Sequence, residues 1–228
     1  MLLILLAFMG IGFYVQWQLK KRFKKYGESL LSNGMTGRAI AEKMLHDNGI
    51  YDVQIVSVPG KLSDHYNPQD KTVNLSPEVY SGQSVSAAAV AAHECGHAVQ
   101  HATAYRWLNM RSMMVPMVNL SSQLMNVLFL LSIFGMFAFG LGQDLLIQIL
   151  IAAQSVITVF ALVTLPVEYD ASNRALAWLE TTNITPGLQQ EEAKDALKWA
   201  ARTYLVAAIA AVTQLVYYIM MYMGRSDD

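Results

Sequence analysis

Hydrophobic and polar positions divide the chain into long uncharged runs separated by polar segments. The uncharged runs are residues 1–19, 115–143, 145–167 and 205–224. A helix rises about 1.5 Å per residue, so each run is long enough to cross a hydrocarbon core of roughly 30 Å. Uncharged runs of this length are more typical of membrane spans than of buried core helices. The pattern therefore predicts four transmembrane helices.

The first run has the character of an uncleaved anchor and not of a signal peptide. Signal peptides carry positive charge before their apolar region and a small-residue cleavage site after it. Here the basic stretch "KKRFKK" follows the apolar run, and no Ala-x-Ala pattern comes after it. We expect the first span to remain in the mature protein.

The segment between the first two runs, residues 20–112, contains signals for helices and strands. "TGRAIAEKMLHDNG" predicts a helix capped by Thr36 and ended by Gly49. "YDVQIVSVPG" alternates like a strand, and "LSDHYNPQDKTVNLS" predicts two short strands around a turn at 67–70. "SVSAAAVAAHECGHAVQHATAY" predicts an alanine-rich helix that begins near Ser84 or Ser86. These elements form an α+β unit.

The second polar segment is predicted to be helical with a break at 185–187. The expected fold is a mainly α membrane protein with a zincin-like α+β unit inserted between spans 1 and 2 and completed after span 3. The division has transmembrane helices at 1–19, 113–143, 145–167 and 204–224, a catalytic segment at 20–112 and a second polar segment at 168–203.

The positive charges predict the orientation of these spans. Of the sixteen Lys and Arg, fifteen lie in the two polar segments, none lies in the short loop expected around Asp144, and only Arg225 follows the last span. Positive loops face the cytoplasm, so we expect the N-terminus outside and both polar segments inside.

Composition narrows the class further. The chain of 228 residues is 54% hydrophobic and 14% charged, with a net charge of −1. This balance gives no indication of a nucleic-acid partner. The single cysteine, Cys95, excludes an intrachain disulfide, as expected for a cytoplasmic domain.

Residues 91–102, "AAHECGHAVQHA", carry the chemistry that stands out. His93 and His97 are four residues apart, so on a helix both imidazoles share a face and can reach one metal ion. Glu94 is rotated by about 100° from His93, where it can lie beside the metal and exchange a proton with water. The alternative is an alanine-rich core helix that happens to contain two histidines.

A third ligand decides between these alternatives. His101 lies about 12 Å along the helix from His93, too far for the same ion. The segment "LPVEYDASNRALAWL" instead offers Glu168 and Asp170 where the third predicted span ends. Because two spans separate this segment from the histidines, both lie on the same side of the membrane. An ionisable residue at such a boundary is costly unless it is functional.

Two blocks, "SDHYNPQDKTVNLSPEVYSGQSVSAAAVAAHECGHAVQHATAY" and "LPVEYDASNRAL", resemble the YugP-like neutral zinc metallopeptidases of bacterial membranes. The resemblance covers most of the chain. A more distant likeness is to the HtpX and CAAX-prenyl-protease group, in which Glu-x-x-x-Asp supplies the third ligand. The resemblance implies that His93, His97 and Glu168 bind one Zn²⁺ per chain and that Glu94 is the catalytic carboxylate.

The sequence departs from the distant group at Ser172, where that group has an aspartate. Asp170 or Ser172 is then left to orient the ligands. The candidates to stabilise the transition state are His65, Tyr66 and Arg174. By likeness to zinc peptidases in general, "KTVNLS" is a candidate edge strand that pairs with substrate, although a plain core strand would look the same.

These features together predict a zinc metalloendopeptidase in the bacterial inner membrane, with its site at the cytoplasmic boundary. Its expected substrates are membrane proteins or their juxtamembrane segments. A non-catalytic zinc-stabilised scaffold is one alternative, although a structural site needs no free carboxylate such as Glu94 beside an open position. An intramembrane zinc protease is the other, although the motif here lies in a polar segment.

Overall fold

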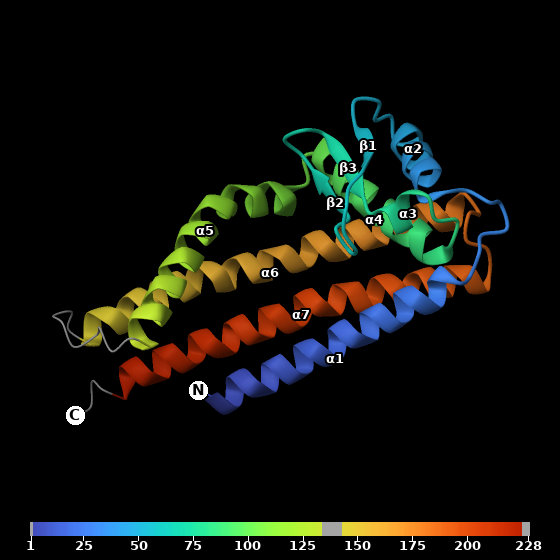
Figure 1. The fold of residues 1–228 in the computed structure, drawn as a ribbon. Coiled ribbons are helices and arrows are strands. Elements are labelled where there is room, and N and C mark those ends of the chain that lie inside the picture. The colour runs from blue at the N-terminus through green and yellow to red at the C-terminus, as the bar shows by residue number, and fades with distance from the viewer. Residues whose placement is uncertain (1, 134–142, 225–228) are drawn as a thin grey trace.

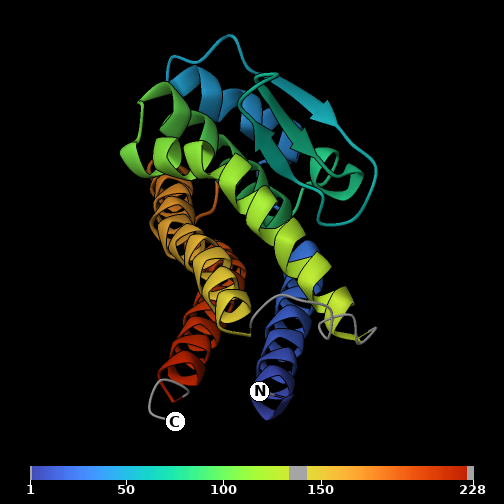
Figure 2. The same cartoon turned by 90° about the vertical axis from the view of Figure 1, so that its left-hand side faces the viewer.

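The computed structural model describes residues 2–133 and 143–224 and has two parts (Figure 1). The small part comprises α2 (Gly37–Asp47), β1 (Gln54–Ser57), β2 (His65–Asn67), β3 (Thr72–Leu75), α3 (Pro77–Tyr80) and α4 (Val85–Ala102). The long helices are α1 (Leu2–Gly27), α5 (Arg106–Ile133), α6 (Gln143–Thr181) and α7 (Leu188–Met223). Figure 2 shows the sheet and α2 together at one end of the long helices.

The predicted α+β unit is present, and its helices begin at the predicted caps. Thr36 accepts a hydrogen bond from the backbone N–H of Ala39, and Ser84 accepts one from Ala87. Gly49 follows α2 with a φ of +72°, a conformation that glycine adopts without a steric penalty. The choice between Ser84 and Ser86 is thus resolved in favour of Ser84.

The sheet has the strand order β1-β3-β2, in which β3 pairs in parallel with β1 and antiparallel with β2. The prediction that "KTVNLS" forms an edge strand is therefore wrong, because β3 is central and has a neighbour on each side. Strand β2, by contrast, pairs with a neighbouring strand on one side only, and it contacts α4. Strand β2 is the edge beside the histidine helix.

Helix α4 lies between the sheet and the long helices and contacts both. Fifteen of its eighteen residues are buried. The alanines that give it helix propensity also let neighbouring helices approach closely on several sides. The core that holds the histidines is thus built around α4.

Three helices in the described part of the chain are long and apolar enough to cross a membrane: Arg106–Leu131, Asp144–Thr181 and Leu188–Met223. The last two are longer than the predicted spans 145–167 and 204–224, and the first begins before its predicted start at residue 113. Asp144 lies in the first turn of α6 and not in a loop, while residues 134–142 lie outside the described residues. The predicted break at 185–187 is confirmed, because α6 ends at Thr181 and α7 begins at Leu188.

Helix α6 continues through Pro166, so the third predicted span and the start of the second polar segment form one helix. Proline removes one intrahelical hydrogen bond but does not end a helix whose neighbours hold it in place. Helix α5 also contains a proline, Pro116, and changes direction along its length (Figure 1).

Buried polar side chains fix α6 against α7. The amide of Gln154 and the hydroxyl of Thr158 both donate to the backbone oxygen of Ala211, at 3.1 Å each. Helix α1 is joined to α7 by Asp195, which accepts hydrogen bonds from Arg22 at 2.8 Å and from Tyr26 at 2.7 Å. The N-terminal end of α1 and the C-terminal end of α7 both lie at the end of the molecule that is far from the sheet (Figure 1).

Candidate metal centre

Helices α4 and α6 meet closely at the predicted motif. A Cβ built on Gly96 would lie 2.6 Å from the backbone oxygen of Ala171, closer than real Cβ contacts allow. Glycine at this position lets α4 approach the turn of α6 that follows Glu168. The close approach brings the two histidines within reach of that carboxylate.

His93, His97 and Glu168 form a cluster whose ligand atoms all lie within 4.8 Å of one another. The Nε2 atoms of His93 and His97 are 3.4 Å and 3.6 Å from Oε2 of Glu168. All three side chains are largely buried. Two imidazoles and one carboxylate facing a common point are a donor set that suits Zn²⁺.

The two oxygens of Glu168 have different surroundings. Oε1 accepts a hydrogen bond from Nη1 of Arg111 on α5, at 2.8 Å. Oε2 is buried without a hydrogen-bond partner and faces the histidines. A buried carboxylate oxygen without a partner is costly, and a cation at the shared point would satisfy it. The residues therefore fit a metal ion.

Gln100 orients His97. The amide nitrogen of Gln100 donates to the backbone oxygen of Val167 and to Oδ2 of Asp170, each at 2.8 Å. Its oxygen therefore faces Nδ1 of His97, 3.0 Å away. Because an amide oxygen only accepts hydrogen bonds, Nδ1 of His97 must carry the proton. The Nε2 atom is left with a free lone pair on the side of Glu168, as a metal ligand requires.

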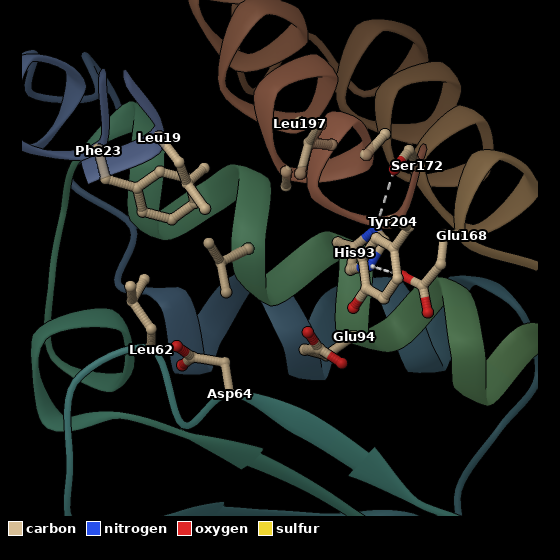
Figure 3. A pocket seen from close by; sticks show the side chains of 13 residues that line it. Leu19, Phe23, Leu62, Asp64, His93, Glu94, Glu168, Ser172, Leu197 and Tyr204 are labelled. Carbon is tan, nitrogen blue, oxygen red and sulfur yellow. Dashed lines mark hydrogen bonds and ion pairs between the residues drawn. The ribbon is translucent and has the colours of Figure 1, made fainter. Parts of the chain in front are cut away.

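Ser172 orients His93. Its hydroxyl is hydrogen-bonded to Nδ1 of His93 at 3.1 Å, which turns the Nε2 atom of His93 toward Glu168 (Figure 3). Asp170 reaches the cluster only through Gln100. The structure thus connects both residues predicted to orient the ligands to the site: Ser172 bonds to His93, and Asp170 bonds to the Gln100 that contacts His97.

The negative charge of Glu168 affects the pKa of His97. Burial lowers the pKa of His97, but the nearby charge of Glu168, 3.6 Å away, outweighs burial and raises that pKa above its usual value. A proton shared between these groups would have to leave before Nε2 of His97 could bind a cation.

Glu94, His93 and Glu168 line one pocket, and Tyr204 of α7 lines the same pocket. Figure 3 shows the phenol of Tyr204 beside His93 and Glu168, with the carboxylate of Glu94 below them. Glu94 is 8% exposed, so it can exchange a proton with a small molecule in the pocket. The arrangement can hold a cation, a water and a proton acceptor together.

The predicted transition-state donors do not line this pocket. His65 is hydrogen-bonded to the backbone oxygen of Ser63, and Tyr66 to His101. Arg174 donates to Asp170 at 2.6 Å. His101 is exposed, and Cys95 is buried with its thiol against the backbone oxygen of Ala41, as expected for a residue facing away from the cluster.

Sequence reasoning missed Gln100, Arg111 and Tyr204. Gln100 follows His97 by three residues, a helical spacing that places it one turn further along, and this spacing is a signal that could have found it. Arg111 comes from a segment predicted to be polar, and Tyr204 comes from a predicted membrane span. Their approach depends on how α5 and α7 pack, which no local pattern shows.

Comparisons with known proteins show to which family the chain belongs. Residues 1–223 match the family described as "Putative neutral zinc metallopeptidase". The chain is 37% identical over 223 residues to the "Putative membrane protease YugP" of Bacillus subtilis (strain 168), covering 98% of this chain and 96% of that protein. No solved structure matches. With its three long apolar helices, the chain is a membrane protein that belongs to this family of zinc metallopeptidases.

Proposed function

We propose that the protein is a membrane-bound zinc endopeptidase that hydrolyses peptide bonds, with one Zn²⁺ per chain. The observation that carries the proposal is the convergence of His93, His97 and Glu168 on one point, with Glu94 in the pocket that His93 and Glu168 line. Three protein ligands leave one position for water, which is typical of catalytic rather than structural zinc.

Each ligand has a partner that holds it. Ser172 and Gln100 fix the two imidazoles, and Arg111 takes one oxygen of Glu168 so that the other faces the metal position. When bound, zinc supplies Lewis acidity that makes hydroxide available near neutral pH. Arg111 limits how much negative charge Glu168 places there, which favours that acidity.

Glu94 is the proton carrier in this proposal. Its carboxylate takes a proton from the attacking water and delivers it to the leaving amine. Tyr204 replaces His65, Tyr66 and Arg174 as the donor to the oxygen of the scissile carbonyl, because it is the phenol that lines the pocket.

We further propose four spans, with α1 as the first. Helix α1 has 26 residues, roughly 39 Å. Several of its large apolar side chains are exposed, which suits contact with lipid: Leu6, Met9, Ile11, Phe13, Tyr14 and Trp17. The basic residues at 20–25, in the C-terminal part of α1, support a site at the cytoplasmic boundary of a bacterial inner membrane. Membrane proteins and their juxtamembrane segments are then the proposed substrates.

The first test is zinc per protomer by elemental analysis of detergent-purified protein. We expect close to one zinc in the wild type and a clear loss in Glu168→Ala. Glu180→Ala, an exposed glutamate on the same helix, is the matched control and should keep its zinc. Wild-type protein without zinc, when metal is supplied in excess, contradicts the proposal.

The second test separates the peptidase from the non-catalytic scaffold. Glu94→Gln should keep the metal and abolish cleavage of reconstituted membrane proteins, while Glu42→Gln, an exposed site on α2, should change neither. If the Glu94→Gln variant, expressed in a deletion strain, restores every phenotype of the wild type, the scaffold is favoured. Ready turnover of free soluble proteins counts against the membrane substrates.

A further inference from the structure

The pocket beside the cluster has a second, apolar end. The metal-facing side chains lie at one end, and Leu19 and Phe23 of α1 lie at the other (Figure 3). Val90 of α4 and Leu197 of α7 line the space between them. The chemistry proposed above uses none of these four side chains, yet they are continuous with the residues that carry it.

This end of the pocket lies between two separate parts of the hydrophobic core. One core cluster contains Val90 and Leu197, and the other contains Leu19 and packs against Ala200. Phe23 packs against both. Small side chains, Ala200 among them, leave the two clusters incompletely joined. The whole pocket, including its metal-facing end, has a volume of about 120 Å³.

The size and lining of the pocket define what it can hold. An apolar cavity of roughly 150 Å³ binds benzene, so the apolar end of this smaller pocket suits a single aliphatic side chain. Its charged lining residues besides the ligands are Asp64 and Glu94, both acidic. Asp64 accepts hydrogen bonds from the backbone and hydroxyl of Ser76 and stays in place. An acidic side chain would meet like charge there.

Leu62 adds an independent observation. It lines the mouth of the pocket, is 46% exposed, and has a φ of +57°. A branched residue in the left-handed region is strained, and such strain gathers at sites that contact ligands. Glycine would relieve the strain, but only an aliphatic side chain extends the apolar wall.

We propose that this pocket is the subsite that selects an aliphatic side chain, of about the size of leucine, next to the bond that is cleaved. The inference rests on the proposed peptidase function and names its specificity. Two of the subsite walls come from α1 and α7, so the same helices that are proposed to sit in the membrane also read the substrate.

The test uses zinc-loaded full-length protein in detergent and peptide hydroxamates that differ only in the side chain beside the zinc-binding group: leucine, alanine or aspartate. Each buried methylene changes an affinity by about fourfold. We therefore expect the wild type to bind the leucine probe at least tenfold more tightly than alanine, with aspartate the weakest.

Variants connect that preference to the pocket. Ala200→Leu should fill the space and remove the preference for leucine while the alanine probe binds as before. Leu62→Gly should weaken the preference without loss of thermal stability. Ala207→Leu, an exposed position on the same helix, is the matched control and should behave as wild type.

The outcomes separate this inference from the function on which it rests. Equal affinity for all probes in the wild type, or a preference that survives in Ala200→Leu, overturns the subsite. A leucine preference that depends on Ala200 without cleavage of any peptide upholds the subsite and overturns the peptidase. Failure of the zinc-loaded protein to bind any probe overturns both.

Discussion

Helices α4 and α5 follow one another in the chain and are both rich in apolar residues, yet their surroundings are opposite. Fifteen of the eighteen residues of α4 are buried within the protein. In the most apolar stretch of α5 only 11% is buried, and large side chains such as Met113 and Leu120 are exposed. Small residues in α4 pack against protein, and large ones in α5 face outward. Apolar content alone does not tell the two roles apart, but side-chain size does.

The largest effect should come from a charge on the outer face of α5. Leu120→Arg places a cation where we propose lipid, at a cost of about 3 kcal/mol if the position is near the bilayer centre. The fraction of chains integrated into membranes in a translocation assay should fall sharply, and Leu120→Met should match the wild type. Unchanged integration of Leu120→Arg would mean that α5 faces water.

The next effect should come from the packing of α4. In Gly96→Ala the added methyl group meets the backbone of α6, so we expect a destabilisation of about 1–3 kcal/mol and a loss of zinc. Gly10→Ala, which has open space around it, is the control and should be nearly neutral. Thermal unfolding and elemental analysis of the same preparations check both. Normal zinc content in Gly96→Ala would contradict the close approach.

Arg111 is an exception to the outward orientation of α5 side chains, because it points inward to Glu168. Arg111→Met should weaken zinc binding by about 10–100-fold, the usual cost of losing a group that holds a ligand. Arg111→Lys should recover part of this loss, since it keeps the charge but not the geometry. Competition with a chelator of known affinity measures the change. Wild-type affinity in Arg111→Met would show that Glu168 needs no second partner.

The smallest effect should come from the side of α4 that faces away from the metal. Burial raises the pKa of the Cys95 thiol, so it should resist iodoacetamide at pH 8 until the protein unfolds. Cys95→Ala should cost about 1 kcal/mol and leave the zinc content unchanged. Rapid labelling of the folded protein would show that α4 is less enclosed than described.

Local signals predicted the local structure well. The caps at Thr36 and Ser84, the three strands and the break before α7 each depend on neighbouring residues. The ends of the long helices were predicted less well. The sequence pattern places the end of a span where charged residues begin. Helix α6 instead continues past Pro166 into the polar segment, because packing against its neighbours holds it.

The candidate site divides in the same way. The spacing of His93 and His97 and the return of the chain after two spans predict that Glu168 and Asp170 lie on the same side as the histidines, and the family resemblance selects Glu168. Arg111 and Tyr204 arrive through helix packing, and the edge position predicted for β3 is wrong because strand order is not encoded in a single strand. Apart from Glu168, contacts between residues close together in the sequence were predictable, whereas contacts that depend on how helices and strands pack side by side were not.

The continuous course of α6 limits how the length of this chain can vary. Gln154 and Thr158 lock the helix to Ala211, and Glu168 follows further along the same unbroken helix. One residue inserted between Thr158 and Glu168 would turn the carboxylate by about 100° away from the histidines. Insertions and deletions should therefore be confined to the connections between helices, and a natural variant with one inside this stretch should have lost its metal.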